Sequence, residues 1–256
     1  IADYGFAGLN VPEGAKLNLI ESSTGSLYVL GGDDAAGIGG NEDENAGVII
    51  IDGGDITALS EGDGAGIGGG YRGGAGEIVI NGGNIYAECL DNDGAGIGGG
   101  NDASVLEITI TGGEVAARAS GGAAGIGGGT NTSYGFHYGD MNGSRTEGKV
   151  GSISISGRDA LVKAWGGTAQ GYSGIYAGAG IGSGYPVGNN NRSVAFDISI
   201  TDGAEVEAYG GEHAQAIGYG YRPEDFTGYG IRLELDDTVR LWAQNADCYQ
   251  PALVMP

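Results

Sequence analysis

Carboxylates and aromatic rings are the side chains of this 256-residue chain that could do chemistry. The chain has only two histidines, His137 and His213, and it lacks a Gly-x-Ser-x-Gly elbow, a His-Glu-x-x-His motif and a paired Cys-x-x-Cys. Serine-hydrolase triads and zinc sites of these types are therefore excluded. Two carboxylates acting as acid and base on a glycosidic bond remain feasible. The candidates in or beside the irregular loops are Asp140, Glu212 and Asp225.

A second acidic pattern consists of Asp34, Asp63 and Asp93, each four residues before an isoleucine of a repeated segment. In register, these carboxylates would repel one another unless a cation or water separated them. Calcium is the candidate cation because it accepts carboxylate and backbone oxygens in flexible geometry. A bound cation would lower the pKa of each carboxyl group in the folded state. The alternative is that all three are solvated turn aspartates.

The repeated segment is Ala-Gly-Ile-Gly-Gly-Gly and its close copies, and it organises the whole chain. Successive isoleucines are separated by 29, 30, 29, 55 and 36 residues. A fixed period of this length, lengthened in places by insertions, indicates a repeat protein. The six isoleucines are Ile38, Ile67, Ile97, Ile126, Ile181 and Ile217.

Each unit contains a strand such as Glu77–Ile80, a Gly-Gly turn, a second strand such as Ile85–Cys89, and the isoleucine segment. The pattern predicts an all-β, single-domain, three-sided right-handed parallel β-helix of about seven coils. We expect an N-terminal cap over residues 1–15, coils over 16–245 and a C-terminal cap over 246–256. A propeller is excluded because 29 residues cannot hold a four-stranded blade.

Insertions recur at one phase of the repeat in coils 4 to 6, so they should gather on one side of the rod. They are rich in tyrosine, and a rigid solenoid bearing aromatic and acidic loops suits saccharide binding. The alternative is a set of tolerated loops without a ligand. The candidate binding residues are Tyr134, His137, Tyr138, Tyr172, Tyr176 and His213.

A further aromatic signal lies on the second strand of three consecutive coils. If the valines of these strands point inward, Trp165, Tyr209 and Trp242 point outward. We therefore expect an exposed in-register ladder on which sugar rings could stack. The alternative is that the inserted loops cover this ladder.

The composition narrows the partners and the location of the chain. A net charge of −22 excludes nucleic acid, whose affinity rests on clustered lysine and arginine. No apolar run is long enough to span a membrane. We expect a secreted or cell-surface protein and a piece of a larger multidomain chain. Cys89 and Cys248 should be about 20 Å apart, so both are expected as free thiols, with Cys89 buried.

Three motifs of the chain resemble the Gly-rich β-helix repeats of secreted or wall-attached bacterial proteins. They are the Asn-Gly-Gly-Asn turns, the Ile-Thr-Ile-Thr-Gly-Gly-Glu-Val strands and the Gly-Ala-Gly-Ile-Gly-Gly-Gly segments. The resemblance covers residues 16 to 245. It implies recognition of oligo- or polysaccharide, with either glycoside hydrolase activity, less often polysaccharide lyase activity, or binding alone. The insertions and the aromatic ladder place the expected site on the loop-bearing side of coils 4 to 7. The alternative function is a non-catalytic adhesin stalk that supplies length and stiffness.

Overall fold

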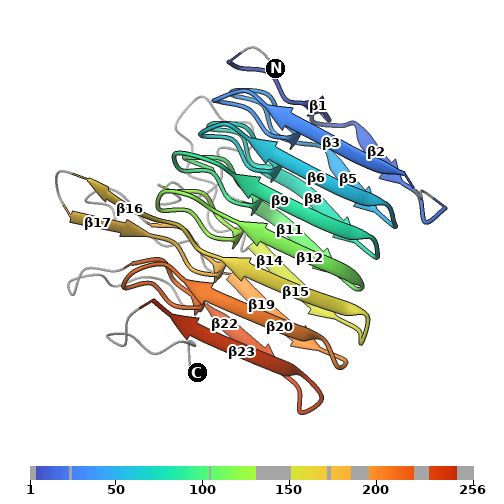
Figure 1. The fold of residues 1–256 in the computed structure, drawn as a ribbon, viewed down its shortest axis with the longest axis vertical. Helices are drawn as coiled ribbons and strands as arrows, with labels where there is room; N and C mark the ends of the chain where they lie inside the picture. The colour runs from blue at the N-terminus through green and yellow to red at the C-terminus, as the bar shows by residue number, and fades with distance from the viewer. Residues whose placement is uncertain are drawn as a thin grey trace.

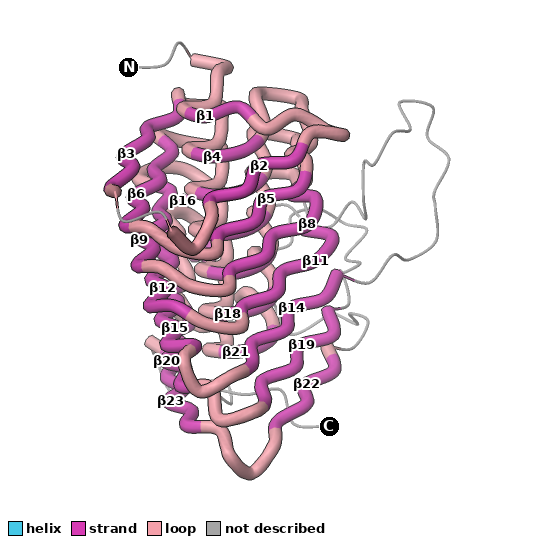
Figure 2. Tube along the Cα trace, turned by 90° about the vertical axis from the view of Figure 1, so that its right-hand side faces the viewer, coloured by secondary structure: helices cyan, strands magenta, loops and turns pink. Residues whose placement is uncertain are grey.

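The computed structural model describes residues 4–22, 25–103, 105–130, 151–171, 174–185, 196–221 and 231–246. These residues form three seven-stranded sheets and one two-stranded hairpin. The three large sheets run along one rod, with the strands of each sheet stacked one above the next (Figure 1). Figure 2 shows the same stacking from another side, with the strands that begin with β3 on the left and those that begin with β2 on the right.

Each large sheet is named after its first strand. The β1 sheet consists of β1 (Leu9–Asn10), β4 (Ile38–Gly39), β7 (Ile67–Gly68), β10 (Ile97–Gly98), β13 (Ile126–Gly127), β18 (Ile181–Gly182) and β21 (Ile217–Gly218). The β2 sheet consists of β2 (Lys16–Leu19), β5 (Val48–Ile51), β8 (Ala75–Ile80), β11 (Val105–Ile110), β14 (Gly151–Ser156), β19 (Phe196–Thr201) and β22 (Arg232–Leu235). The β3 sheet consists of β3 (Ser26–Gly31), β6 (Asp55–Ser60), β9 (Asn84–Cys89), β12 (Gly113–Arg118), β15 (Ala160–Trp165), β20 (Glu205–Gly210) and β23 (Arg240–Asn245).

All pairs within these sheets are parallel, and each strand pairs with the equivalent strand of the next coil. Ile97 lies opposite Ile67 on one side and Ile126 on the other. In the β2 sheet, Ile108 lies opposite Ile78 and Ile153 in the same way. The predicted three-sided parallel β-helix of about seven coils is therefore confirmed.

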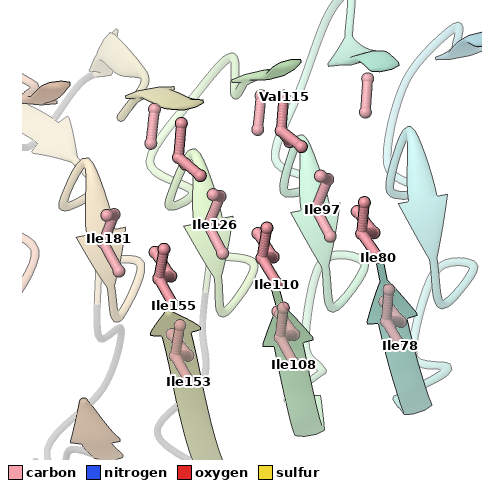
Figure 3. Close-up of a cluster of buried hydrophobic side chains, with 14 of the residues drawn as sticks. Ile78, Ile80, Ile97, Ile108, Ile110, Val115, Ile126, Ile153, Ile155 and Ile181 are labelled. Atoms are coloured by element: carbon pink, nitrogen blue, oxygen red, sulfur yellow. The ribbon is translucent and has the colours of Figure 1, made fainter. Parts of the chain in front are cut away.

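Rows of aliphatic side chains fill the interior of the rod. The β1 sheet contributes Leu9 from its first strand and one isoleucine from each later strand, and each strand of the β2 sheet contributes two alternate residues, such as Ile78 and Ile80 (Figure 3). The β3 sheet contributes a β-branched residue and an alanine, such as Ile85 and Ala87. Residues in these rows in the central coils are at most 3% exposed. The burial of stacked methyl and methylene groups is the main stabilising contribution of the fold.

The glycine after each β1-sheet isoleucine is a backbone requirement. Gly68 has φ +140°, and a Cβ built on it would collide with the carbonyl oxygen of Gly98 in the next coil. Gly182 has φ +134° and meets the carbonyl oxygen of Gly218 in the same way. An L side chain is therefore excluded by conformation and by space, which explains why this position of the repeat is invariant from Gly39 to Gly218.

The structure refines the expected boundaries at the N-terminal end. Residues 1–15 were predicted as a cap, but β1 lies within this range and pairs with β4, so it is the first strand of the β1 sheet. Strand β3 was not predicted, yet it pairs in register with β6. Of the predicted C-terminal cap, residues 247–256 lie outside the described residues.

The cysteine prediction is confirmed for Cys89, which is a buried free thiol. Its Sγ lies 2.8 Å from the carbonyl oxygens of Gly62 and Asp91. Burial raises the pKa of this thiol to about 12, so it stays protonated and unreactive at neutral pH. Cys248 lies outside the described residues. None of the described segments contains a helix long and apolar enough to cross a membrane.

Candidate functional site

The residues just before each β1-sheet isoleucine lie beside the residues just after it. The N–H of Ala65, two residues before Ile67, donates to the carbonyl oxygen of Gly69, two residues after it, at 2.9 Å. Ala179 and Ser183 make the same bond around Ile181 at 3.0 Å. Residues four before and four after the isoleucines therefore share one surface, which we call the loop face. Its members are Asp34, Asp63, Asp93, Gly122, Ala177 and His213 before the isoleucines, and Glu42, Tyr71, Asn101, Thr130, Tyr185 and Tyr221 after them.

In the N-terminal half, hydrogen bonds between neighbouring coils hold the loop face together. The side-chain amide of Asn101 donates to Oδ1 of Asp63 at 3.1 Å. The hydroxyl of Thr130 donates to Oδ1 of Asp93 at 2.7 Å, and the N–H of Gly122 donates to the same oxygen at 2.9 Å. These two aspartates thus obtain their donors from the protein, and Thr130 is buried in the process.

Burial and repulsion between like charges raise the pKa of Asp63 and of Asp34. The pKa of Asp63 is raised to about 6, chiefly by burial and then by the charges of Asp93 and Asp34, against the lowering effect of the Asn101 bond. Burial and the charge of Glu42 raise the pKa of Asp34.

The described segments contain no group of three or more His, Cys, Asp and Glu side chains arranged to hold a metal ion. The structure as described therefore adds no support to a calcium site formed by Asp34, Asp63 and Asp93, and that site stays a prediction. Asp63 and Asp93 each accept a hydrogen bond from a side chain of a neighbouring coil.

In the C-terminal half, the same face is aromatic. Tyr185 and Tyr221 stack with ring centroids 6.1 Å apart and planes 12° from parallel. Tyr176 meets Tyr185 edge-on at 4.7 Å, and the ring of His213 lies 5.2 Å from that of Tyr221. All four side chains are half-buried. They form what we call the tyrosine cluster.

Small residues make room for this cluster. Gly122 occupies the position held by Asp93 one coil earlier, and a Cβ on Gly122 would lie 2.9 Å from the Cβ of Tyr185. Ala177 occupies the same position one coil later, where its carbonyl oxygen accepts the N–H of Tyr221 at 2.7 Å. An aspartate at position 122 would collide with Tyr185, so the tyrosine requires the small residue there.

The inserted hairpin of coil 5 adds to this side of the rod. It is formed by β16 (Thr168–Gly171) and β17 (Gly174–Ala177), which pair antiparallel and project from the end of β15 (Figure 1). The hairpin supplies Tyr176 to the cluster. It also anchors the next loop, because the N–H of Glu212 donates to the hydroxyl oxygen of Thr168 at 2.8 Å.

Of the predicted site residues, the structure brings Tyr176 and His213 together and places Glu212 beside them. The exposed Glu212 carboxylate lies 3.9 Å from Nε2 of His213. Tyr185 and Tyr221 were missed as individual site residues, although both fell within predicted insertions. The available signal was their shared phase, four residues after Ile181 and Ile217. The remaining loop candidates lie outside the described residues: Tyr134, His137, Tyr138, Asp140, Tyr172 and Asp225.

The predicted aromatic ladder on the β3 sheet is only partly correct. Trp165 and Tyr209 are paired and stack at 5.6 Å with planes 6° apart. Trp242 is out of register, because it lies opposite Glu207, while Gln244 lies opposite Tyr209. The prediction assumed that Val239 is the equivalent of Val206 in the next coil. The residue that pairs with Val206 is Leu241.

The stack on the β3 sheet also leaves little ring face for a ligand. The guanidinium of Arg118 covers the ring of Trp165 at 4.6 Å, while Tyr209 stacks on the same ring from the next coil. The hydroxyl of Tyr209 donates to Glu207 at 2.8 Å, and Lys163 pairs with Glu207 at 3.1 Å. The bonds from Tyr209 and Lys163 lower the pKa of Glu207, and Arg118 and Tyr209 cover the ring of Trp165. The contacts of Trp165 and Lys163 join neighbouring strands, so this surface stabilises the sheet itself.

Comparison with known proteins supports the fold. A family model described as "Beta helix repeat" matches residues 49–71, 78–101 and 108–130. These matches fall on three successive repeats of the regular half and on none of the tyrosine cluster. No curated protein and no solved structure matches the chain.

Proposed function

We propose that this β-helix is an extracellular carbohydrate-recognition module that binds an oligo- or polysaccharide at the tyrosine cluster. The observation that carries the proposal is the meeting of Tyr176, Tyr185, Tyr221 and His213 on one surface of the inserted coils. Four half-buried rings offer both apolar faces or edges and polar tips. Sugars present the same combination, with C–H faces for packing and hydroxyl groups for hydrogen bonds.

The rigid scaffold favours such a site. The backbone under Tyr185 and Tyr221 is held by the bonds from Tyr185 N–H to the Gly122 carbonyl at 2.6 Å and from Tyr221 N–H to the Ala177 carbonyl at 2.7 Å. The rings also pack against one another, and burial among its neighbours raises the pKa of Tyr185. A ligand that binds here would therefore order few side chains on binding, which keeps the entropic cost low.

We propose recognition without cleavage. A glycosidase needs two carboxyl groups on opposite sides of the scissile bond. Glu212 is the described candidate, and its exposed carboxylate faces His213. Asp140 and Asp225, the other two candidates, lie outside the described residues. Release of reducing ends from a bound glycan, abolished by Glu212→Gln, would show hydrolase activity and contradict this part of the proposal.

The test is a glycan array followed by titration of the best ligand. Tyr221→Ala should weaken binding at least tenfold, or about 1.4 kcal/mol, because it removes the ring that contacts both Tyr185 and His213. Tyr71→Ala is the matched control, since Tyr71 has the same phase in the acidic half and should leave affinity unchanged. Absence of binding to plant, microbial and mucin glycans, or equal losses in both variants, would contradict the proposal.

A further inference from the structure

Large apolar side chains are exposed mainly at the two ends of the described rod. Eight such residues are exposed, and six of them precede β4 or follow β21. Outward-facing polar caps normally close the ends of a solenoid, because an uncovered coil leaves strand edges and core rows open. The six residues are Tyr4, Phe6, Ile20, Tyr28, Leu235 and Trp242.

The interior rows also continue into the end strands without a change to polar residues. Ile85 in the middle of the β3 sheet is 1% exposed, whereas Leu27 in β3 and Leu241 in β23, which belong to the same row, are only half-buried. Both remain leucine. The end strands thus keep the pattern of strands that another coil covers, although the described residues supply no such coil.

One register would match the two ends on the β3 sheet. The strand pairs from β3 to β23 place Tyr28 and Trp242 in the same outward column, and place Leu27 and Leu241 in the same inward row. If β23 were followed by another copy of β3 in that register, Trp242 would lie beside Tyr28 and Leu241 beside Leu27. Trp242 and Tyr28 are now 61% and 67% exposed. The stacked Trp165 and Tyr209 show the contact that such neighbours make.

The same register matches the other two sheets. On the β2 sheet, Leu233 would lie opposite Leu17 and Leu235 opposite Leu19, since both pairs already share rows. On the β1 sheet, Ile217 would lie opposite Leu9, as Ile38 does now. Three sheets therefore give apolar pairs from a single rigid placement.

We propose that the β21–β22–β23 end of one copy docks on the β1–β2–β3 end of a second copy, so that the solenoid continues in register across the contact. The strand edges would supply backbone hydrogen bonds, and the leucine rows would supply the apolar contact. Such a head-to-tail contact does not close, so it forms open linear rods. This inference is independent of the proposed glycan site.

The charges of the chain predict how its association depends on salt concentration and on a single substitution that replaces a basic residue with an acidic one. Each copy carries a charge of −22, so association requires screening and should increase with salt. In the proposed register, Arg232 lies opposite Lys16, which is a like-charge pair. Lys16→Glu should therefore strengthen association about fivefold, although it makes the chain more acidic. Arg158→Glu, which changes the net charge equally on the turn between β14 and β15, should not strengthen it.

The first measurement is sedimentation velocity of the 256-residue chain across protein concentration and salt. We expect oligomers that lengthen with concentration, and an at least tenfold weaker association for Trp242→Asp. Leu161→Asp, at an exposed site on the middle strand β15, is the control and should associate normally. A monomer at every concentration and salt level, or equal effects of both variants, would overturn the proposal.

The second measurement tests the register in a Cys248→Ser background. Ser26→Cys and Arg240→Cys place one thiol at each end, and the two positions lie in one column of the β3 sheet. A mixture of the two variants should form the mixed disulfide under oxidation, whereas Ser26→Cys with Lys163→Cys should not. If the dominant disulfide instead joins two copies of the Ser26→Cys variant, the N-terminal ends of two copies pair with each other, and the proposed register is overturned.

Discussion

The loop face differs between the two halves of the rod, although the backbone beneath it is the same. In the N-terminal half, Asn101 N–H donates to the carbonyl of Asp63 at 2.8 Å, and in the C-terminal half Tyr221 N–H donates to the carbonyl of Ala177 at 2.7 Å. The side chains at these positions form a hydrogen-bonded acidic row in one half and the tyrosine cluster in the other. Since the backbone bonds and the interior rows hold the coil, the loop-face side chains can change without loss of the fold.

The largest expected effect concerns the scaffold that both halves share. Gly68→Ala and Gly182→Ala should each lower the free energy of unfolding by at least about 3 kcal/mol, because alanine is strained at their φ angles and meets a carbonyl oxygen of the next coil. Urea unfolding of both variants measures this, with Gly14→Ala, whose Cβ meets no neighbour, as a control for positive φ alone. A mild effect in one half only would show that the two halves differ in their backbone as well.

A smaller effect concerns the acidic row. Because the native pKa of Asp63 is about 6 and its usual value is 3.8, the native state binds more protons than the unfolded state between these pH values. The contribution of Asp63 to the free energy of unfolding therefore falls as pH rises through this window. Asp63→Asn keeps an oxygen for the Asn101 bond and removes the charge, so it should stabilise the chain at pH 7 by about 1 kcal/mol after solvent screening.

The measurement is thermal unfolding of this variant from pH 4 to pH 7.5. The wild-type chain should lose stability relative to Asp63→Asn as pH rises, whereas Asp237→Asn, on an exposed turn far from the row, should run parallel to the wild type. Lower stability of Asp63→Asn at pH 7 would mean that the charge is favourable, and the acidic row would then need a cationic partner.

The smallest expected effect is that of calcium. Since the donors of Asp63 and Asp93 come from the protein, addition of millimolar calcium or of EDTA should leave the melting temperature within about 1 °C. Thermal melts of the wild type and of Asp63→Asn under both conditions test this. A rise with calcium that is absent in Asp63→Asn would contradict it and make the acidic half a metal-binding region.

The fold could be predicted largely because the residue types of the repeat indicate which positions face inward and where only glycine fits. The isoleucine of each segment is an inward residue, and the glycine after it has a backbone that only glycine adopts freely, so the period alone locates one sheet. Strand β3 and the register of Trp242 were missed for the opposite reason. In both end coils the repeat has decayed, and only pairing with β6 or β20 identifies the inward residues.

The candidate site was harder to predict than the fold. Of the residues predicted from the insertions, Tyr176 and His213 belong to one cluster of rings in the structure. The sequence could not show that Gly122 makes room for Tyr185, since the two residues are far apart along the chain and meet only through the stacking of coils. It also could not show that Thr130 and Asn101 donate hydrogen bonds to Asp93 and Asp63 from the neighbouring coils.

The sequence by itself determined the period and the inward rows, because both follow from side-chain type at a fixed spacing. Only the tertiary structure decided which side chains of neighbouring coils meet. Contacts between coils are set by strand register and by the length of each insertion. Examples are the contacts of Asp63 with Asn101, of Arg118 with Trp165 and of Tyr185 with Tyr221. A shift of two residues in one strand, as for Trp242, moves a ring to a different neighbour while its face of the sheet stays the same.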